Sequence, residues 1–480
     1  MTLNDNKSSV IVQGRADVWE WFTDNNGVVR AGIGFDDKSW SMVYRKSEDE
    51  KFRKLGKARY DDENAGYDLL RLAAGTDEGY ILNNKATGRY ALYKFNFATK
   101  QLGDLILGTD TNDITDYALS EDGKTLKAAW YTTDHDRIVW YDDKLKQHQS
   151  EIDAAVSGNE NWIGSRSRDD QTMIVWTGAS NNPGSYYVYT LSDGRMHLLA
   201  RMNERVKPAE LAPATYTHYH ARDGLDVPAY LTLPLGRAPK NLPLIILPHG
   251  GPFSVRDSMD YDPDVQLLAN RGYAVLQPNF RGSDSYGKDF YEKGFGEWGR
   301  KMQDDLDDGM DWLVKNGVAD PKRVCIVGAS YGGYAAMWGA TRNPDRYRCA
   351  ASYAGISDMG KMLKYDNTYW ISKKYRKDWR TKVQGKIDFD LKSVSPIFNV
   401  DKMQVPLLIV HGDADQNVPY KQSKSYADAL QKAGKVVEFY THKDEGHGFS
   451  SSENAKDWYD RLDTFLAKYN PADPAAAAKP

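Results

Sequence analysis

The stretch Val324-Cys325-Ile326-Val327-Gly328-Ala329-Ser330-Tyr331-Gly332-Gly333-Tyr334 decides the fold of the second half of this chain. Four apolar residues lead into a Gly-x-Ser-x-Gly motif, and small residues at helical spacing follow it. This order of strand, tight turn and helix forces the serine into a strained backbone conformation, so its neighbours must be small. The motif predicts a nucleophilic Ser330 and an oxyanion-binding Tyr331 amide. An ordinary glycine-rich turn is the alternative.

Bulk composition indicates a soluble globular protein of two domains. The chain has 480 residues, of which 41% are hydrophobic and 27% are charged. A net charge of -4 argues against nucleic acid as a partner, and no apolar run is long enough to predict a membrane span. The first residues carry no signal-peptide core, so the sequence as given predicts a cytoplasmic protein. A periplasmic or secreted location would follow if a preceding segment is missing.

Two cysteines, Cys325 and Cys349, lie in strands predicted on either side of the helix that follows Ser330. Their spacing fits neither a metal site nor a redox pair. Such strands are usually neighbours in an open sheet, so a disulfide is an open alternative. We expect instead two buried thiols that act as small apolar side chains.

The first half of the chain, residues 1–205, is predicted to be almost entirely β-strand. Aromatic, alternating runs are separated by turn signals such as Asn25-Asn26-Gly27 and Ser192-Asp193-Gly194. The centres of four such runs recur every 47 to 49 residues, near Val43, Leu92, Val139 and Tyr187. A fixed period of this size is typical of β-propeller blades, and about four blades fit. An irregular β-sandwich is the alternative, but it predicts no period.

From residue 206 to residue 470 the pattern changes to strands that alternate with helices. Fully apolar strands in such a pattern indicate a mostly parallel sheet covered by helices on both faces, which is an α/β fold. An Asp-Gly turn signal at Asp223-Gly224 predicts a hairpin before this sheet. Residues 471–480 are rich in Ala and Pro and are expected to form a flexible tail. The predicted strands are Leu244–Leu247, Tyr273–Gln277, Arg323–Val327, Cys349–Tyr353, Leu407–Val410 and Val436–Tyr440, and the clearest helices are Met302–Asn316 and Tyr420–Ala433.

A nucleophilic serine needs a base, and the base needs an acid that fixes its tautomer. In α/β-hydrolases these follow the serine in the order Asp, His, each on a loop after a later strand. His447 is therefore the predicted general base, and the acid is either Asp413 or Asp415. Upstream, the run Pro248-His249-Gly250-Gly251-Pro252 follows the first strand of the sheet. Gly251 is the natural second oxyanion donor, and His249 is expected to help shape the site.

These motifs together resemble the prolyl oligopeptidase family of serine peptidases, in the branch of acylaminoacyl peptidases and dipeptidyl peptidases. The resemblance spans about residues 205–470. In the family's His-Gly-x-x-Asp-x-x-Val pattern the final aspartate is catalytic, which implies Asp415. The family also places a β-propeller before the hydrolase domain. The matching motifs are His249-Gly250-Gly251-Pro252, Asn279-Phe280-Arg281-Gly282-Ser283, Gly328-Ala329-Ser330-Tyr331-Gly332-Gly333, the run from His411 to Pro419, and Glu445-Gly446-His447-Gly448.

The resemblance also implies a pocket for P1, the substrate residue whose carbonyl is attacked. Residue types at the matching positions predict an apolar pocket for medium or large uncharged side chains. Burial in the ordinary core is the alternative for the apolar ones. Asn417 matches the place where the dipeptidyl-peptidase branch holds a substrate carbonyl. The positions matching the P1 pocket are Tyr331, Ile356, Met359, Met362 and Val418.

The resemblance departs from the family in one respect. The family's propellers typically have seven or eight blades, so this chain is either a natural short form or lacks its first blades. Open blade edges would favour self-association into a homo-oligomer. We expect a serine peptidase that hydrolyses oligopeptides without metal or other cofactor. A carboxylesterase of the same fold and a catalytically impaired propeller that binds a partner are the alternatives.

Overall fold

A computed structural model describes residues 8–15, 17–35, 39–59, 67–369, 373–386 and 389–473. The chain divides into two compact units. The first comprises Met1–Lys146, Ser285–Asp289 and Trp370–Asp378, and the second comprises Gln147–Asp284, Phe290–Tyr369 and Trp379–Pro480. In the described ranges no helix is both long and apolar enough to cross a membrane. Most of the predicted tail, residues 474–480, lies outside the described residues.

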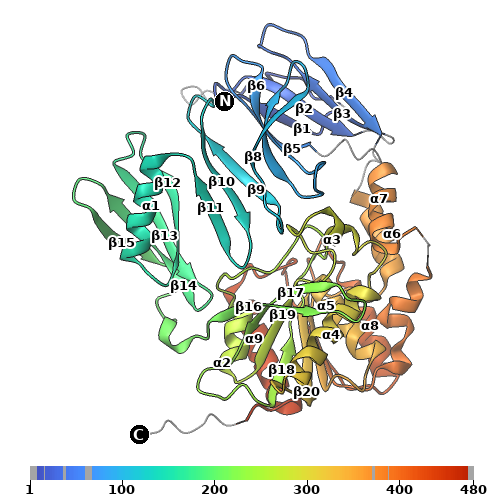
Figure 1. The fold of residues 1–480 in the computed structure, drawn as a ribbon. Coiled ribbons are helices and arrows are strands. Elements are labelled where there is room, and N and C mark those ends of the chain that lie inside the picture. Colours follow the sequence, from blue (N-terminus) through green and yellow to red (C-terminus); the bar gives the residue numbers. More distant parts are fainter. Residues whose placement is uncertain are drawn as a thin grey trace. The chain divides into compact units, whose positions relative to one another are not determined.

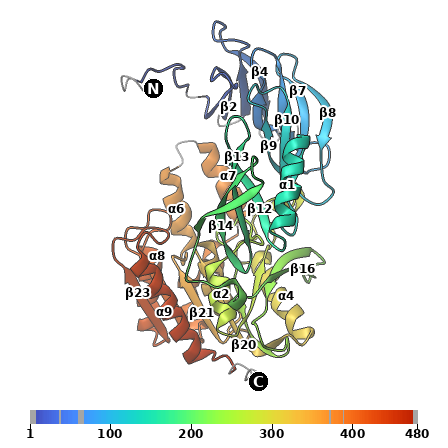
Figure 2. The same cartoon turned by 90° about the vertical axis from the view of Figure 1, so that its left-hand side faces the viewer.

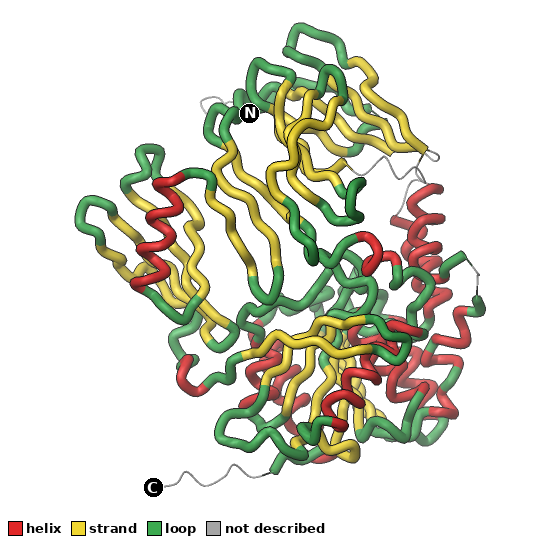
Figure 3. Tube along the Cα trace, viewed as in Figure 1, coloured by secondary structure: helices red, strands yellow, loops and turns green. Residues whose placement is uncertain are grey.

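Antiparallel sheets make up most of the chain before residue 205 (Figures 1 and 3). The first sheet contains β1 (Glu20–Thr23), β2 (Val29–Phe35), β3 (Ser39–Tyr44) and β4 (Arg53–Arg59). The second contains β5 (Tyr67–Leu72), β6 (Glu78–Asn83), β7 (Ala91–Asn96) and β8 (Gln101–Leu107). The third contains β9 (Ile114–Leu119), β10 (Leu126–Thr132) and β11 (Asp136–Trp140). The fourth contains β12 (Glu160–Arg166), β13 (Thr172–Ala179), β14 (Asn182–Thr190) and β15 (Arg195–Arg201).

In each of these sheets every strand pairs with its neighbour in sequence. Three sheets have four strands and one has three. A series of such small meanders is the architecture of propeller blades, so the region fits a partial β-propeller and the predicted fold class is confirmed. The first three sheets belong to the first compact unit and the fourth belongs to the second. The domain boundary predicted between residues 205 and 206 stays a prediction.

One helix of this region is missed by the sequence analysis, which predicted almost only strands there. Helix α1 (Asp143–Ala155) packs beside the fourth sheet, where Glu151 accepts a hydrogen bond from the hydroxyl of Tyr189 (Figure 3). Its apolar signal is weak because only Leu145 and Ile152, seven residues apart, are buried hydrophobic side chains. The carboxylate of Asp142 accepts hydrogen bonds from the amides of residues 144 and 145, which is a readable N-cap signal.

An eight-stranded sheet forms the centre of the second unit, in the order β16-β17-β19-β18-β20-β21-β22-β23. The predicted Asp223-Gly224 hairpin joins β16 to β17, and the antiparallel β17 pairs with β19. All later pairs are parallel. The strands are β16 (Ala214–His220), β17 (Asp226–Thr232), β18 (Leu242–Ile246), β19 (Ala274–Pro278), β20 (Ala319–Ala329), β21 (Cys349–Tyr353), β22 (Leu407–Gly412) and β23 (Val437–His442).

Helices cover both faces of this sheet, as the strand pattern predicts (Figures 1 and 2). Alternate residues of each strand join one of two buried clusters, because successive side chains point to opposite faces. One cluster contains side chains of α4, α5 and α8, and the other contains side chains of α2 and α9. These helices are α2 (Pro263–Asn270), α4 (Lys301–Lys315), α5 (Tyr331–Arg342), α8 (Lys421–Lys432) and α9 (Ser452–Tyr469), and the other helices after residue 206 are α3 (Lys288–Glu292), α6 (Met359–Tyr369) and α7 (Lys373–Gln384).

The expectation of two free thiols is wrong, because Cys325 and Cys349 form a disulfide. The two residues are direct partners in the parallel pair β20 and β21, with their Cα atoms 4.8 Å apart. This separation lies within the range that a disulfide requires. The sequence analysis placed both cysteines on neighbouring strands, but it had no means of fixing the register that sets them opposite each other.

Two carboxyl groups near the start of α2, Asp257 before it and Asp264 in its first turn, give the stability of this domain a dependence on pH. Burial, with the nearby carboxylate of Asp262, raises the pKa of Asp257 to about 8. The same two causes raise the pKa of Asp264. In the unfolded chain an aspartate has a pKa of about 3.9, so folding requires proton uptake between that value and about pH 8. The free energy of unfolding contributed by these groups therefore falls as the pH rises through this window.

We accordingly expect the melting temperature of the Asp257→Asn variant to depend less on pH than that of the unmodified protein. Asparagine keeps the shape of the protonated carboxyl group and cannot ionise. Thermal unfolding of both proteins at pH 5 and pH 8 measures the effect, with the exposed Asp401→Asn change as a control. An equal fall in melting temperature for all three proteins between pH 5 and pH 8 would contradict the assignment.

Candidate active site

Ser330 lies on the sharp turn between β20 and α5, where the sequence places the nucleophile. Its φ is +59°, in the left-handed region that non-glycine residues rarely adopt. The turn is possible because glycines surround it. A Cβ on Gly328 would lie 2.5 Å from the backbone of Gly332, and a Cβ on Gly332 would lie 2.2 Å from the carbonyl oxygen of Pro248. The glycines of the motif therefore allow the serine turn to lie in close contact with the loop that follows β18.

Ser330, His447 and Asp415 are joined by hydrogen bonds. The Nε2 atom of His447 lies 3.0 Å from the Oγ atom of Ser330. Its Nδ1 atom donates to Oδ2 of Asp415 over 2.7 Å. The three side chains follow β20, β23 and β22, whose parallel carboxyl ends share one edge of the sheet. This geometry allows His447 to accept the serine proton while Asp415 fixes the tautomer of the ring.

The carboxylate of Asp415 accepts four hydrogen bonds from the protein. Oδ2 accepts from His447 and from Nε2 of His411, and Oδ1 accepts from the backbone amides of Asn417 and Val418. Burial alone would raise the pKa of Asp415, but the bonds from His411, His447 and the Val418 amide hold it well below its usual value. The group is thus an anion locked in one orientation. Asp413, the other candidate, is exposed and accepts from the amide of Asp444 instead.

His411 is a residue of the site that the sequence analysis did not single out for a role. Its side chain is fully buried, and its Nε2 atom faces two acceptors, Oδ2 of Asp415 at 3.1 Å and the carbonyl oxygen of Val418 at 3.0 Å. Nε2 must therefore carry the hydrogen. The Nδ1 atom, 2.7 Å from Oγ of Ser423, is then the acceptor for the serine hydroxyl. A histidine at the end of an apolar strand, four residues before the predicted acid, was the available signal.

Replacement of His411 by leucine is expected to lower kcat about tenfold and to change KM little. One hydrogen bond to a charged group contributes about 1.5–3 kcal/mol, part of which would be lost in the transition state as His447 becomes charged. Glutamine can place an amide donor near the position of Nε2, so His411→Gln should recover part of kcat. Steady-state kinetics of the three proteins check this. Equal kcat values in the leucine variant and the unmodified protein would contradict a positioning role.

Hydrogen bonds to Glu445 stabilise the loop that carries His447. This buried carboxylate accepts hydrogen bonds from Ser450, Ser451 and Asn454, and these bonds contribute to lowering its pKa to about 2. The loop also touches the turn after β22, because a Cβ on Gly412 would lie 2.3 Å from the carbonyl oxygen of Glu445. Glycine at this position lets the acid loop and the base loop approach closely.

The loop His249-Gly250-Gly251-Pro252 lies directly beside the nucleophile. A Cβ on Gly250 would stand 3.5 Å from Cβ of Ser330. Burial lowers the pKa of His249 to about 4, so its ring is neutral. Its Nδ1 atom lies 2.6 Å from the carbonyl oxygen of Gly250, and its Nε2 atom lies 2.8 Å from Oγ of Ser283. Both nitrogens are thus used to fix the loop, and a contact of His249 with substrate stays a prediction.

The predicted oxyanion donors lie on the two sides of Ser330. Tyr331 is the first residue of α5, so its amide has no acceptor within the helix. Gly251 has a φ of +108°, which glycine adopts readily. The roles of both amides stay predictions.

Most of the residues predicted to line the P1 pocket are buried. Ile356, Met359, Met362 and Val418 are at most 8% exposed and belong to the same buried cluster as Tyr331. This cluster extends over one face of the sheet, so the grouping of these residues into a P1 pocket stays a prediction. The side chain of Asn417 differs from these in being exposed.

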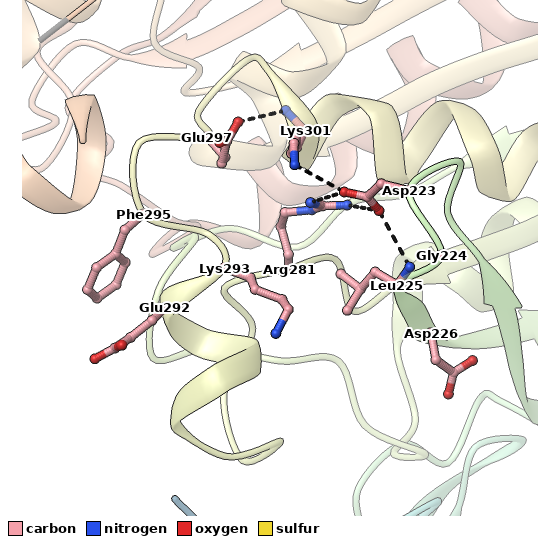
Figure 4. Close-up of a pocket in the computed structure, with 10 residues that line it drawn as sticks. All are labelled: Asp223, Gly224, Leu225, Asp226, Arg281, Glu292, Lys293, Phe295, Glu297 and Lys301. Carbon is pink, nitrogen blue, oxygen red and sulfur yellow. Dashed lines mark hydrogen bonds and ion pairs between the residues drawn. The ribbon is translucent and has the colours of Figure 1, made fainter. Parts of the chain in front are cut away.

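A charged cavity of about 560 Å³ lies elsewhere in this unit, and none of the three hydrogen-bonded residues lines it (Figure 4). Arg281 crosses its wall and donates to Asp223 and to the buried Asp305. Lys301 forms a second ion pair with Asp223. Arg281 and Lys301 thus balance the charges of Asp223 and Asp305, which favours a structural role for Arg281. Over the ranges described, no cluster of three or more His, Cys, Asp or Glu side chains is placed to hold a metal ion.

Comparisons with known proteins point to one family. Residues 259–471 match the model of the prolyl oligopeptidase family. Dipeptidyl aminopeptidase BIII of Pseudoxanthomonas mexicana is 36% identical over 361 residues, which are 72% of this chain and 52% of that protein. Dipeptidyl peptidase family member 6 of Caenorhabditis elegans is 32% identical over 66% of this chain and 46% of its own length. The chain thus spans about half the length of the curated relatives it matches.

Solved structures show the same fold at lower identity. A puromycin-hydrolyzing peptidase of Mycobacterium tuberculosis superposes with a TM-score of 0.77 at 20% identity, over 97% of this chain and 72% of that one. An acylaminoacyl peptidase of Pyrococcus horikoshii superposes with a TM-score of 0.66 at 18% identity, over 93% of this chain and 70% of that one. These structures support the arrangement of a propeller followed by a hydrolase domain.

Proposed function

This chain belongs to the prolyl oligopeptidase family, and we propose that it is a serine peptidase that hydrolyses oligopeptides through an acyl-enzyme intermediate. The observation that carries the proposal is the unbroken hydrogen-bond path from Oγ of Ser330 through His447 to Asp415. The path begins at a serine in a strained turn next to a helix start, an arrangement typical of nucleophilic serines.

In this mechanism Ser330 attacks the substrate carbonyl carbon while His447 accepts the hydroxyl proton. The amides of Tyr331 and Gly251 stabilise the negative charge that develops on the carbonyl oxygen. His447 then donates its proton to the leaving amine, and the acyl group remains on Ser330. A water molecule, deprotonated by His447, releases the acyl group by the reverse sequence. Asp415 stays ionised throughout and stabilises the charged ring of His447.

The proposal includes the substrate contacts inferred from the resemblance. Ile356, Met359, Met362 and Val418 would contact the P1 side chain, and the exposed amide of Asn417 would hold a substrate carbonyl. Flexible thioether side chains adapt to different shapes, which suits a peptidase that accepts several P1 residues.

A comparison of amide and ester substrates with the same acyl group tests this proposal. A peptidase cleaves a peptidyl anilide and the corresponding ester, and both activities should disappear in the Ser330→Ala variant. Cleavage of the ester with no measurable cleavage of the anilide would refute the peptidase assignment and favour a carboxylesterase. Absence of both activities would favour a protein that binds without catalysis.

A further inference from the structure

One face of α6 carries both predicted P1 methionines and a carboxylate. Met359, Met362 and Asp366 are spaced by three and four residues, so they lie on the same side of the helix. The helix is tied to the acid loop, because the hydroxyl of Tyr365 donates to the carbonyl oxygen of Gln416 over 2.7 Å. Asp366 therefore lies on the face that the predicted pocket uses, about two helical turns beyond Met359.

An aromatic wall, formed by Phe253, Trp298, Tyr331 and Trp379, connects Asp366 with the serine turn. Oδ2 of Asp366 accepts a hydrogen bond of 2.7 Å from Nε1 of Trp379. The ring of Trp379 contacts Phe253 and Trp298, with centroids 6.2 and 6.0 Å apart. Trp298 contacts Tyr331 at 4.8 Å, and Phe253 directly follows the loop of the predicted oxyanion donor. The wall thus runs from the carboxylate of Asp366 to the residue after the nucleophile.

Among the described residues, no Lys, Arg or His side chain forms an ion pair with Asp366. In the part of the chain that the structure describes, the indole of Trp379 is its one hydrogen-bond partner, and no ion pair reaches it. Burial raises the pKa of Asp366 to about 6 against the opposing effect of the indole bond. A partly buried carboxylate without a cation is costly, and a positively charged ligand would reduce that cost. Asp223 and Asp305 differ, since both are paired with Arg281.

We propose that Asp366 binds the cationic head of an arginine or lysine side chain at P1, which extends the proposed peptidase function and rests on it. The methionines of α6 would contact the aliphatic stem of that side chain, and Trp379 would stack against a guanidinium group. Asp366 lies beyond Met359 and Met362 along α6, so the proposed cation is one carried at the end of a long side chain. The pocket expected to suit uncharged residues is therefore apolar along its length and acidic at its end.

The free amino terminus of a short substrate is another positive charge that Asp366 could bind. The position of Asp366 beside the methionines of α6 favours the P1 side chain. The two sources are separated by substrates with a blocked amino terminus, which have no second cation. An acetylated peptide with P1 arginine should retain the preference described below.

The test compares acetylated dipeptide anilides with P1 arginine and P1 citrulline, which has nearly the same shape without the charge. The unmodified protein should show at least about a tenfold higher kcat/KM for arginine, as expected for one charge-assisted contact. In Asp366→Asn this ratio should fall to near one. Asparagine can still accept the hydrogen bond from Trp379, so the tie between α6 and α7 is retained. The exposed Asp401→Asn change is the matched control and should keep the ratio of the unmodified protein.

A ratio near one in the unmodified protein, or an unchanged ratio in Asp366→Asn, would overturn the inference. A preference that appears only with free amino termini, at any P1 residue, would assign Asp366 to the terminus instead and would also overturn it. Calorimetry with Ser330→Ala, which cannot turn over substrate, separates this result from failure of the peptidase proposal. Tighter binding of the acetylated arginine dipeptide amide than of its citrulline counterpart would support the subsite even if no amide is cleaved. Equal binding would refute it.

Discussion

Replacing Ser330 with alanine should lower kcat/KM for a peptidyl anilide by about 10⁴- to 10⁶-fold, because the variant loses the attacking oxygen and leaves His447 without a proton to accept. The backbone of the turn is set by the glycines around it, so the fold should survive the change. Among the described residues, His447 is the one hydrogen-bond partner of Oγ of Ser330, so the change removes no other hydrogen bond. Thermal unfolding should confirm a melting temperature within a few degrees of the unmodified protein.

Ser352→Ala is the matched control for this variant. Ser352 lies on β21 opposite Gly328, and its buried hydroxyl has no hydrogen-bond partner among the described residues. Removal of this hydroxyl should leave anilide hydrolysis within about twofold, since a surface or unbonded group contributes little. Residual activity of Ser330→Ala above a few per cent would show that another group attacks the substrate, and it would contradict the mechanism.

The second large effect is expected for Asp415→Asn, which should reduce kcat by about 10⁴-fold, as loss of the charge and of the correct histidine tautomer does in serine peptidases. Both carboxylate oxygens of Asp415 accept hydrogen bonds from N–H groups. Asparagine replaces one of these oxygens with an NH₂ group, which would face an N–H donor and could not accept its hydrogen bond. The clash would displace either His447 or the backbone amides of Asn417 and Val418. Both kcat and the melting temperature should therefore fall.

Asp413→Asn distinguishes this effect from a general sensitivity of the loop. Asp413 lies two residues away, is exposed and accepts a hydrogen bond from the amide of Asp444. Its replacement should change kcat by no more than a few-fold, because asparagine can accept the same bond. Comparable losses in both variants would contradict the assignment of Asp415 as the acid.

The predictions from sequence agree with the structure where the local sequence permits few backbone conformations. A serine between Gly328 and Gly332, after an apolar strand, can hardly fold other than as the observed turn, and the three residues of the triad lie where strand ends predict them. The 47- to 49-residue period of aromatic strands likewise predicted the successive small sheets. The boundaries of the predicted strands shifted by a few residues, because hydrogen bonding extends β20 and β22 beyond their apolar cores.

The features that were missed depend on register and on contacts between distant segments. The disulfide requires Cys325 and Cys349 to be opposite partners, and sequence indicated only that their strands were neighbours. In the sequence His411 was only part of a matching motif, and its role became visible from the hydrogen bonds of its ring to Asp415 and Ser423. Asp366 carried no signal in the sequence, because the proposal for it rests on its hydrogen bond from Trp379, thirteen residues later, and on the lack of an ion pair to it among the described residues.

Labelling with a fluorophosphonate, followed by intact-mass spectrometry, tests the central claim most directly. The reagent reacts with a serine only when a neighbouring base activates it and donors stabilise the phosphoryl oxygen. The account predicts one adduct per chain in the unmodified protein, located on Ser330, and none in Ser330→Ala. No adduct in the unmodified protein, or an equal adduct in both proteins, would contradict the claim that Ser330, His447 and Asp415 form a competent nucleophilic site.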